Sequence, residues 1–447
     1  MKLQKICAAS GDISRLLVAA TAAIATTAAF AKSFVPFYLI GSTPIFAATC
    51  VFGMALVAVA WRDIRDNAVY AADALLVLGL LYGAVVTNYF IYSAGQVPMT
   101  HLLGILIFHS LFLVFGFAAA RALKTVYMVL LAQAAIYLII IGQYAVRFGD
   151  LMRDGYLHDI FGVGGIDSKL VTTFHQPIGT SLGLAVLAML GLAANRRKFL
   201  AVVVLPFVFW FMFHIAARAA MVALVCSLIF LVWADAWVRS KKLASMSLAV
   251  VTISAALASG LFYEYAVKDR DVDLVAPDAI SRTIREIQSQ DPGFRLPIWE
   301  RTWHRITSEP DRLLFGRGIG MFPIDEGVGA PDWLLRKTEA ASYSPHNVHL
   351  ELLYETGMAG MLIFSILTLF PLAAALKHWK QFWMPEKAAI SLYVFYLVSV
   401  EISGSFAFSY DFQFFLALAI GVVSLKRKEL AGARTPSFEY LDHQVSA

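Results

Sequence analysis

Charged residues are scarce in this chain of 447 residues: 15% are Asp, Glu, Lys or Arg, whereas 59% are hydrophobic. The mean hydropathy is +0.70. This composition excludes a soluble globular protein, and the chain is too long for one or two membrane anchors. The sequence therefore predicts an all-α polytopic membrane protein.

Cysteine is almost absent as well. Cys7, Cys50 and Cys226 are the three in the sequence, and each lies within an apolar segment or at its cytoplasmic end. Their number and placement exclude a disulfide framework and a cysteine-based metal site. The sequence also lacks an internal repeat and a matched pair of Gly/Pro-broken spans, which counts against an inverted-repeat transporter.

Apolar segments are abundant, and about twelve of them meet the requirement of about 20 mostly apolar residues for a membrane span. They cover residues 15–31, 37–60, 69–92, 101–120, 123–146, 176–194, 199–216, 219–236, 243–266, 347–376, 388–404 and 412–425. We expect a single transmembrane domain over residues 1–447.

Lysine and arginine cluster after every second segment. The clusters are Lys2, Lys5 and Arg15; Arg62 and Arg65; Arg121 and Lys124; Arg196, Arg197 and Lys198; Arg239, Lys241 and Lys242; Lys377 and Lys380; and Lys426, Arg427 and Lys428. Because cytoplasmic loops hold the excess of positive charge, both termini are predicted to be cytoplasmic. The net charge of +5 thus reflects topology rather than nucleic-acid binding.

The same alternation places residues 267–345, the longest polar segment, on the far side of the membrane as a folded cap. Ile280, Ile284 and Ile287 recur at helical spacing, which predicts an amphipathic helix at the membrane surface. A second helix is predicted from Pro297 to about Ser308. The glycines between 316 and 320 then predict a tight turn.

His346 lies where this cap meets the tenth span. Ser344 and Pro345 have the residue types of an N-cap and a first helical residue, so we expect His346 in the first helical turn. The positive end of the helix dipole disfavours the imidazolium form there, and a neutral imidazole can accept a proton. The alternative is a helix-capping or interfacial histidine.

Two arginines lie on the same predicted side. Arg218 stands in a very short turn between two apolar segments, and Arg295 directly precedes the predicted helix at Pro297. Because the planar guanidinium group binds phosphate oxygens in pairs, these residues are candidates for binding a diphosphate. The alternative is that their long side chains extend to the membrane surface without a ligand.

Other polar residues on this side are weaker candidates: Asn347, His349, His175, Gln176, Arg147, Lys169 and Trp299. Trp299, with Trp303, could stack on sugars or belong to the interfacial aromatic belt. Glu401 and Asp73 lie within apolar segments and are candidates without an assigned role. We expect no metal site, because His346 and His349 do not form the His-Glu-x-x-His arrangement and Asp271-Val272-Asp273 is a common pattern.

Three motifs occur in a fixed order. They are Ala217-Arg218-Ala219; Arg295-Leu296-Pro297-Ile298-Trp299 followed by Gly316-Arg317-Gly318; and His346-Asn347-x-x-Leu350-Glu351 with Glu355-x-Gly357-x-x-Gly360. In their order and sidedness the chain resembles the O-antigen ligase and polymerase superfamily of bacterial envelope glycosyltransferases. The resemblance covers about residues 170–365 in motif and the whole chain in topology. Ala217 stands where that family often has serine.

The resemblance implies a glycosyltransferase of the bacterial inner membrane with its site facing the periplasm. The donor would be O-antigen linked to undecaprenyl diphosphate, the acceptor the lipid A-core, and no metal or other cofactor would take part. His346 would be the catalytic base, and Arg218 and Arg295 would bind the diphosphate during an inverting transfer. A histidine with a pKa near 6.5 is largely neutral at pH 7 and suits this role.

Repeat-unit polymerases and protein O-oligosaccharyltransferases share these motifs. The expected spans, with the large loop between the ninth and the tenth, favour a ligase that matures lipopolysaccharide. An alternative from another class is a non-enzymatic lipid or polysaccharide transporter in which the loop is a gate.

Overall fold

The computed structural model describes residues 2–31, 34, 42–148, 175–193, 198–215, 217–246, 249, 284, 288, 295–326 and 344–432. Within these residues the fold is all-helical, apart from one isolated bridge between Ala94 and Val97. The helices are α1 (Lys2–Phe30), α3 (Ser42–Val59), α4 (Trp61–Ala68), α5 (Ala72–Asn88), α6 (Met99–Ala119), α7 (Leu123–Phe148), α9 (His175–Leu192), α10 (Lys198–His214), α11 (Arg218–Arg239), α14 (Arg295–Ser308), α15 (Met321–Asp325), α16 (Val348–His378), α17 (Met384–Ser403) and α18 (Tyr410–Leu430).

Several helical stretches are long and apolar enough to cross a membrane. In the described part of the chain, four meet this criterion fully: Ile64–Ser93, Met99–Ile140, Arg218–Arg239 and Val348–Gln381. Shorter apolar helices cover Ser14–Phe30, Thr43–Val59, Gln176–Leu192 and Val203–Phe213. Most of the predicted span 243–266 lies outside the described residues, so the total of about twelve spans stays a prediction.

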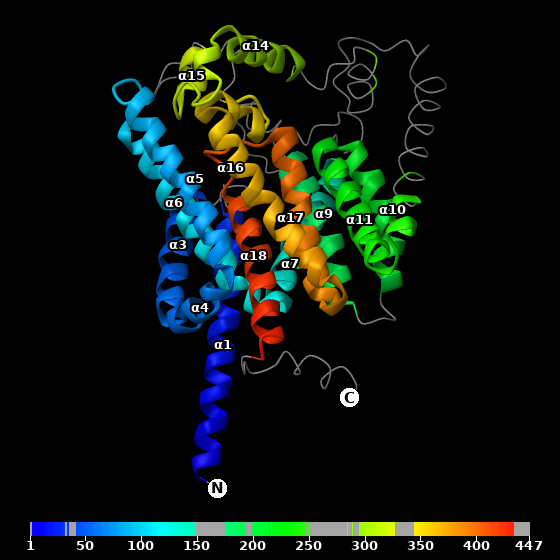
Figure 1. Ribbon diagram of the computed structural model, residues 1–447. Coiled ribbons are helices and arrows are strands. Elements are labelled where there is room, and N and C mark those ends of the chain that lie inside the picture. The colour runs from blue at the N-terminus through cyan, green and yellow to red at the C-terminus, as the bar shows by residue number, and fades with distance from the viewer. Residues whose placement is uncertain are drawn as a thin grey trace.

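The bundle is organised around α18, which packs against α6, α16, α17 and α1 (Figure 1). Small residues permit the close approach that membrane helices need. A Cβ atom on Gly116 of α6 would lie 2.0 Å from the carbonyl oxygen of Phe414, and one on Gly421 would lie 2.7 Å from the Cβ of Ala120. The α6–α18 contact therefore requires glycine at two points.

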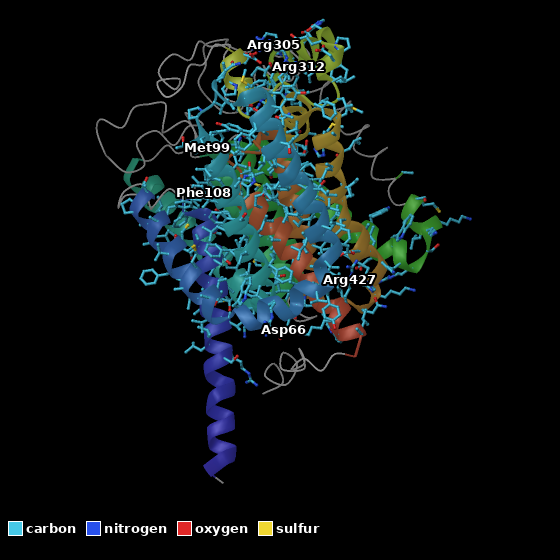
Figure 2. All side chains as sticks on the ribbon, turned by 60° about the vertical axis from the view of Figure 1, so that its left-hand side comes forward. Asp66, Met99, Phe108, Arg305, Arg312 and Arg427 are labelled. Atoms are coloured by element: carbon cyan, nitrogen blue, oxygen red, sulfur yellow. The ribbon has the colours of Figure 1, made fainter. Side chains whose placement is uncertain are left out.

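Charged side chains lie at both ends of the bundle. Arg305 and Arg312 lie at the end covered by α14 and α15, whereas Asp66 and Arg427 lie at the opposite end (Figure 2). Asp73, predicted only as a functional candidate, accepts from Arg427 Nη1 at 2.9 and 3.0 Å. Asp73 therefore belongs to an ion pair at the end away from the cap.

The described part of the predicted cap consists of α14, a short 3-10 turn, a glycine turn and α15. The helix predicted from Pro297 to Ser308 is confirmed and begins two residues earlier, at Arg295. The glycine turn is also confirmed, because Gly316, Gly318 and Gly320 all have positive φ. The helix predicted around Ile280–Ile287 lies outside the described residues except for Ile284, which is helical and buried.

The predicted tenth span lies in α16, and this helix is broken at one residue. Gly357 has φ 70° and ψ −170°, which breaks the helix after its first turns. Neighbouring backbone groups bond to the cap instead: Arg317 N donates to Tyr354 O, Gly318 N to Glu355 O, Met358 N to Leu313 O and Ala359 N to Leu314 O, at 2.9–3.2 Å. The break is stable because residues 313–318 form hydrogen bonds with the backbone N–H and C=O groups that it leaves without helical partners.

We predict that Gly357→Ala destabilises the protein by at least about 2 kcal/mol, because only glycine adopts this backbone conformation without strain. The added Cβ would also lie 2.4 Å from the carbonyl of Leu314. The apparent melting temperature, followed by size-exclusion chromatography after heating, measures the effect. The matched control is Gly79→Ala in α5, where a Cβ meets no atom within 4 Å; an equal loss in both variants would contradict the prediction.

Candidate functional site

The start of α16 differs from the sequence prediction. His346 is not in the first helical turn; Asn347 is the N-cap and the helix begins at Val348. Asn347 Oδ1 accepts from Leu350 N at 2.8 Å, whereas Ser344 Oγ accepts from His346 N at 3.3 Å. Asn347 rather than Ser344 is the N-cap because its side chain reaches the third helical N–H, whereas the Ser344 side chain closes a local turn before the helix.

His346 has a strained backbone. With φ 56° it is the one non-glycine residue with positive φ among the residues that the structure describes. This left-handed conformation is uncommon for a residue with a Cβ atom, and such strain concentrates at functional sites.

Glu401, in the last turn of α17, holds this segment from the other side. His349 Nδ1 lies 2.7 Å from Glu401 Oε1, and Asn347 Nδ2 donates to the Glu401 carbonyl at 2.9 Å. The His349 ring packs edge-on against Phe364 with centroids 5.2 Å apart. A carboxylate at Nδ1 fixes the imidazole tautomer and leaves Nε2 as the acceptor in the neutral form.

Arg295 reaches the same end of α17. Its Nη2 donates to Ser403 Oγ at 3.0 Å, two residues beyond Glu401. Trp299, one turn later in α14, donates from Nε1 to the carbonyl of Pro345 at 2.7 Å. Because α14 contacts both Ser403 and the residue before His346, it joins the arginine to the histidine segment. The hydrogen bond of the Trp299 indole thus has a structural role, and the predicted stacking of Trp299 on a sugar is untested.

Arg218 is the first residue of α11, directly after Ala217, which is fully buried. A Cβ atom on Gly179 of α9 would lie 2.3 Å from the Ala217 Cβ, so α9 and α11 are tightly packed at this point. The tight packing fixes the position of the Arg218 backbone. A cation at a helix N-terminus is electrostatically unfavourable unless an anion is near.

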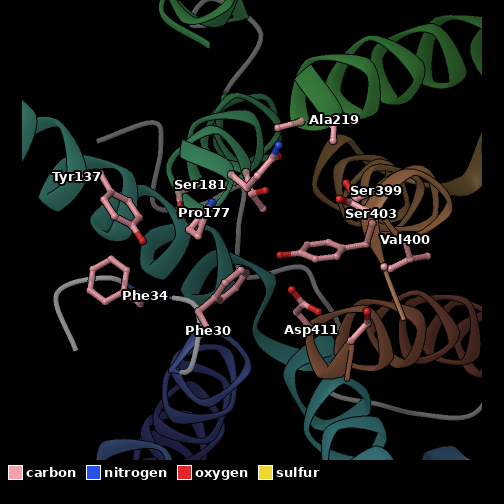
Figure 3. Close-up of a pocket in the computed structure, with 16 residues that line it drawn as sticks. Phe30, Phe34, Tyr137, Pro177, Ser181, Ala219, Ser399, Val400, Ser403 and Asp411 are labelled. Atoms are coloured by element: carbon pink, nitrogen blue, oxygen red, sulfur yellow. The ribbon is translucent and has the colours of Figure 1, made fainter. Parts of the chain in front are cut away.

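A cavity of about 220 Å³ lies between these segments (Figure 3). Its lining includes Ala219 and Ala220 next to Arg218, Ser403 and Gly404 at the end of α17, and Asp411 of α18. The other polar side chains lining it are Tyr137, Gln176, Thr180, Ser181, Tyr396, Ser399 and Ser409. Polar and apolar groups therefore share this lining, and the apolar groups form the larger part.

The predicted site residues differ in how they relate to the cavity. Gln176 lines it, Arg295 contacts Ser403 in its wall, and Arg218 precedes the lining residue Ala219 in sequence. Asn347 and His349 bind Glu401 close by. His346 precedes these last two but is not among the described lining residues. Lys169 and the side chains of Arg147 and His175 fall outside the described part.

Three other arginines in the described part of the cap are held in ion pairs. Arg301 and Arg305 contact the two oxygens of Glu326 at 3.1 and 2.7 Å. Arg317, in the glycine turn, pairs with Glu309 and Asp325. Burial lowers the pKa of Arg317, but Tyr354, Glu309 and Asp325 outweigh it and raise the pKa overall. These three cations stabilise the cap and are engaged by carboxylates.

Two features escaped the sequence reasoning. The pairing of Glu401 with His349 joins residues 52 positions apart, which no local pattern indicates. Asp411 was not among the candidates, although a carboxylate in the predicted outer segment before the last span was a usable signal. No cluster of three or more His, Cys, Asp or Glu side chains suited to a metal ion occurs among the described residues.

Comparison with known families gives one match: the sequence model of a family described as O-antigen ligase matches residues 208–365. This range contains Arg218, Arg295 and His346. No curated protein matches the chain.

We predict that His346→Gly leaves the protein about 1 kcal/mol more stable than His346→Ala, because glycine adopts positive φ without the steric penalty that alanine has. Chemical or thermal unfolding of the two variants measures the difference. The control is the same pair at His304, an exposed residue within α14, where glycine should be the less stable by about 1 kcal/mol. A more stable alanine variant at both positions would refute the strain at His346.

Proposed function

We propose, from the match of residues 208–365 to the sequence model of the O-antigen ligase family, that the protein transfers O-antigen polysaccharide from undecaprenyl diphosphate to the lipid A-core. The reaction takes place at the periplasmic face of the bacterial inner membrane, and both termini are cytoplasmic. The family supports a lipid-linked glycan as the substrate in general. The choice of ligase rather than polymerase is our inference.

The observation that supports the proposal is that residues of two of the three motifs contact the end of α17. Arg295 binds Ser403, and the segment after His346 binds Glu401, so two distant motifs meet within three residues of one helix. Arg218 adjoins the cavity that Ser403 lines. A bound diphosphate-linked sugar at this place would have cations on one side and imidazole groups on the other.

In the proposed reaction, His346 accepts the proton of an acceptor hydroxyl while the oxygen attacks the anomeric carbon. The bond from that carbon to the diphosphate oxygen breaks, and undecaprenyl diphosphate leaves with inversion at the sugar. General-base catalysis of this kind contributes about 10²- to 10⁴-fold in rate. The activated diphosphate linkage supplies the driving force, so no nucleotide is required.

The arginines have the complementary role. Negative charge develops on the departing diphosphate, and guanidinium groups stabilise it while remaining charged at any physiological pH. Arg218 and Arg295 each begin a helix, so backbone N–H groups add to the positive field. Glu401 supports the site indirectly by holding Asn347 and His349.

We predict that His346→Ala, Arg218→Ala and Arg295→Ala each lower transfer at least about 100-fold while the proteins still insert and fold. The assay follows polymer transfer from extracted glycolipid donor to lipid A-core by purified protein in proteoliposomes. His304→Ala in α14 and the exposed Arg65→Ala are the matched controls and should retain wild-type rates.

Near wild-type transfer by His346→Ala would reject the base assignment. If function survives that change but is lost when charges inside the bundle are altered, the protein is a transporter.

We also predict the lipopolysaccharide phenotype of a strain that lacks the protein. For a ligase, polymer disappears from the lipid A-core and accumulates on the lipid carrier, because its transfer step is missing; gel electrophoresis shows both. Re-expression of the wild-type chain is the control. A core that carries a single repeat unit identifies a polymerase instead, and unchanged lipopolysaccharide with loss of glycoprotein identifies a protein O-oligosaccharyltransferase.

A further inference from the structure

We propose that the cavity bounded by α9, α11, α17 and α18 binds the donor's first sugar ring, with Asp411 hydrogen-bonding its hydroxyl or amide groups, while the diphosphate stays outside near Arg218 and Arg295. This inference rests on the proposed function and adds to it the location and chemistry of a sugar-binding subsite.

The charges of the cavity argue against a phosphate inside it. Among the described residues that line it, Asp411 is the one charged side chain, and its charge has the sign of the phosphate groups. A diphosphate placed beside this carboxylate would be repelled in a partly desolvated space. Arg295 is not among the described lining residues and donates to one of them, Ser403. The anion therefore lies at the mouth, and a neutral group occupies the interior.

The lining also argues against the polyprenyl chain. Thr180, Ser181, Ser399, Tyr396 and Gln176 line the cavity together with Asp411. Hydrocarbon would offer no hydrogen bond to the Gln176 amide or the Asp411 carboxylate, which is costly for buried polar groups. A sugar ring offers donors and acceptors to such a lining. The lipid tail is better accommodated by the apolar outer faces of the helices.

The size admits a sugar ring. The cavity volume is about 220 Å³, which is room for several water molecules or for one ring. Phe30 and Phe34 also line the cavity and supply apolar contact for the carbon face of a sugar. The cavity therefore has both the polar and the apolar surfaces that a pyranose presents.

Asp411 is well placed to recognise such a ring. Figure 3 shows its carboxylate turned toward the space that Ser403 and Ser181 also face. Oδ1 accepts from the N–H of Phe412 at 2.9 Å, which fixes the side chain at the start of α18. Each carboxylate oxygen has more than one acceptor site, so Asp411 can still bind hydroxyls. Its second neighbour is the hydroxyl of Tyr396.

The test compares two probes on the full-length protein in lipid nanodiscs: undecaprenyl diphosphate, and the glycolipid donor extracted from cells that lack the protein. Asp411→Asn keeps the acceptor for Phe412 N and removes the charge. We expect it to weaken binding of the glycolipid about tenfold, as for the loss of charged hydrogen bonds. Binding of undecaprenyl diphosphate should be unchanged. Arg295→Ala should weaken binding of both probes.

A second variant, Ser181→Phe, fills the cavity from its buried wall and should have the same selective effect; Gln176→Ala replaces it if the phenylalanine prevents folding. Asp73→Asn, at the opposite end of the bundle, is the control and should bind both probes normally. Equal weakening of both probes, or no weakening of either, by the cavity variants overturns the subsite. A wild-type protein that binds neither probe instead refutes the proposed function.

Discussion

Backbone hydrogen bonds at the break in α16 hold the cap on the bundle. The bonds from Arg317, Gly318, Met358 and Ala359 use only main-chain groups, so the contact needs close approach rather than particular side chains. Gly316 and Gly357 meet this need, because a Cβ on either would lie within 2.6 Å of the opposite backbone. With the cap fixed in this way, α14 is held over the end of α17 and Arg295 reaches Ser403.

The end of α17 links the separate parts of the site. Glu401 binds the segment that follows His346, Ser403 binds Arg295, and Gly404 lines the cavity. Beyond it, Glu351 accepts from Ser405 Oγ and Phe406 N at 2.8 and 3.0 Å, which fixes the connection to α18. The positions of a histidine segment, an arginine and a carboxylate therefore depend on one short stretch between two helices.

Much of the fold follows from the sequence because a membrane imposes simple rules: long apolar runs form helices, and basic clusters mark one end of the bundle. The motif residues Arg218, Arg295 and His346 became candidates for the same reason, since polar groups at span ends are costly and have few explanations. The helix start at Asn347 and the break at Gly357 could not be predicted from the sequence, because both depend on partners distant in sequence. Asn347 gains a bond to Glu401, and Gly357 needs the residue 313–318 segment to complete its broken hydrogen bonds.

The left-handed backbone of His346 has an evolutionary consequence. A histidine adopts this conformation only at a cost in folding free energy. In the proposed function, selection for the imidazole as a base opposes that cost. In a gene copy released from this selection, glycine or asparagine would accumulate at position 346, and such a replacement would mark relatives in which the ancestral chemistry has been lost.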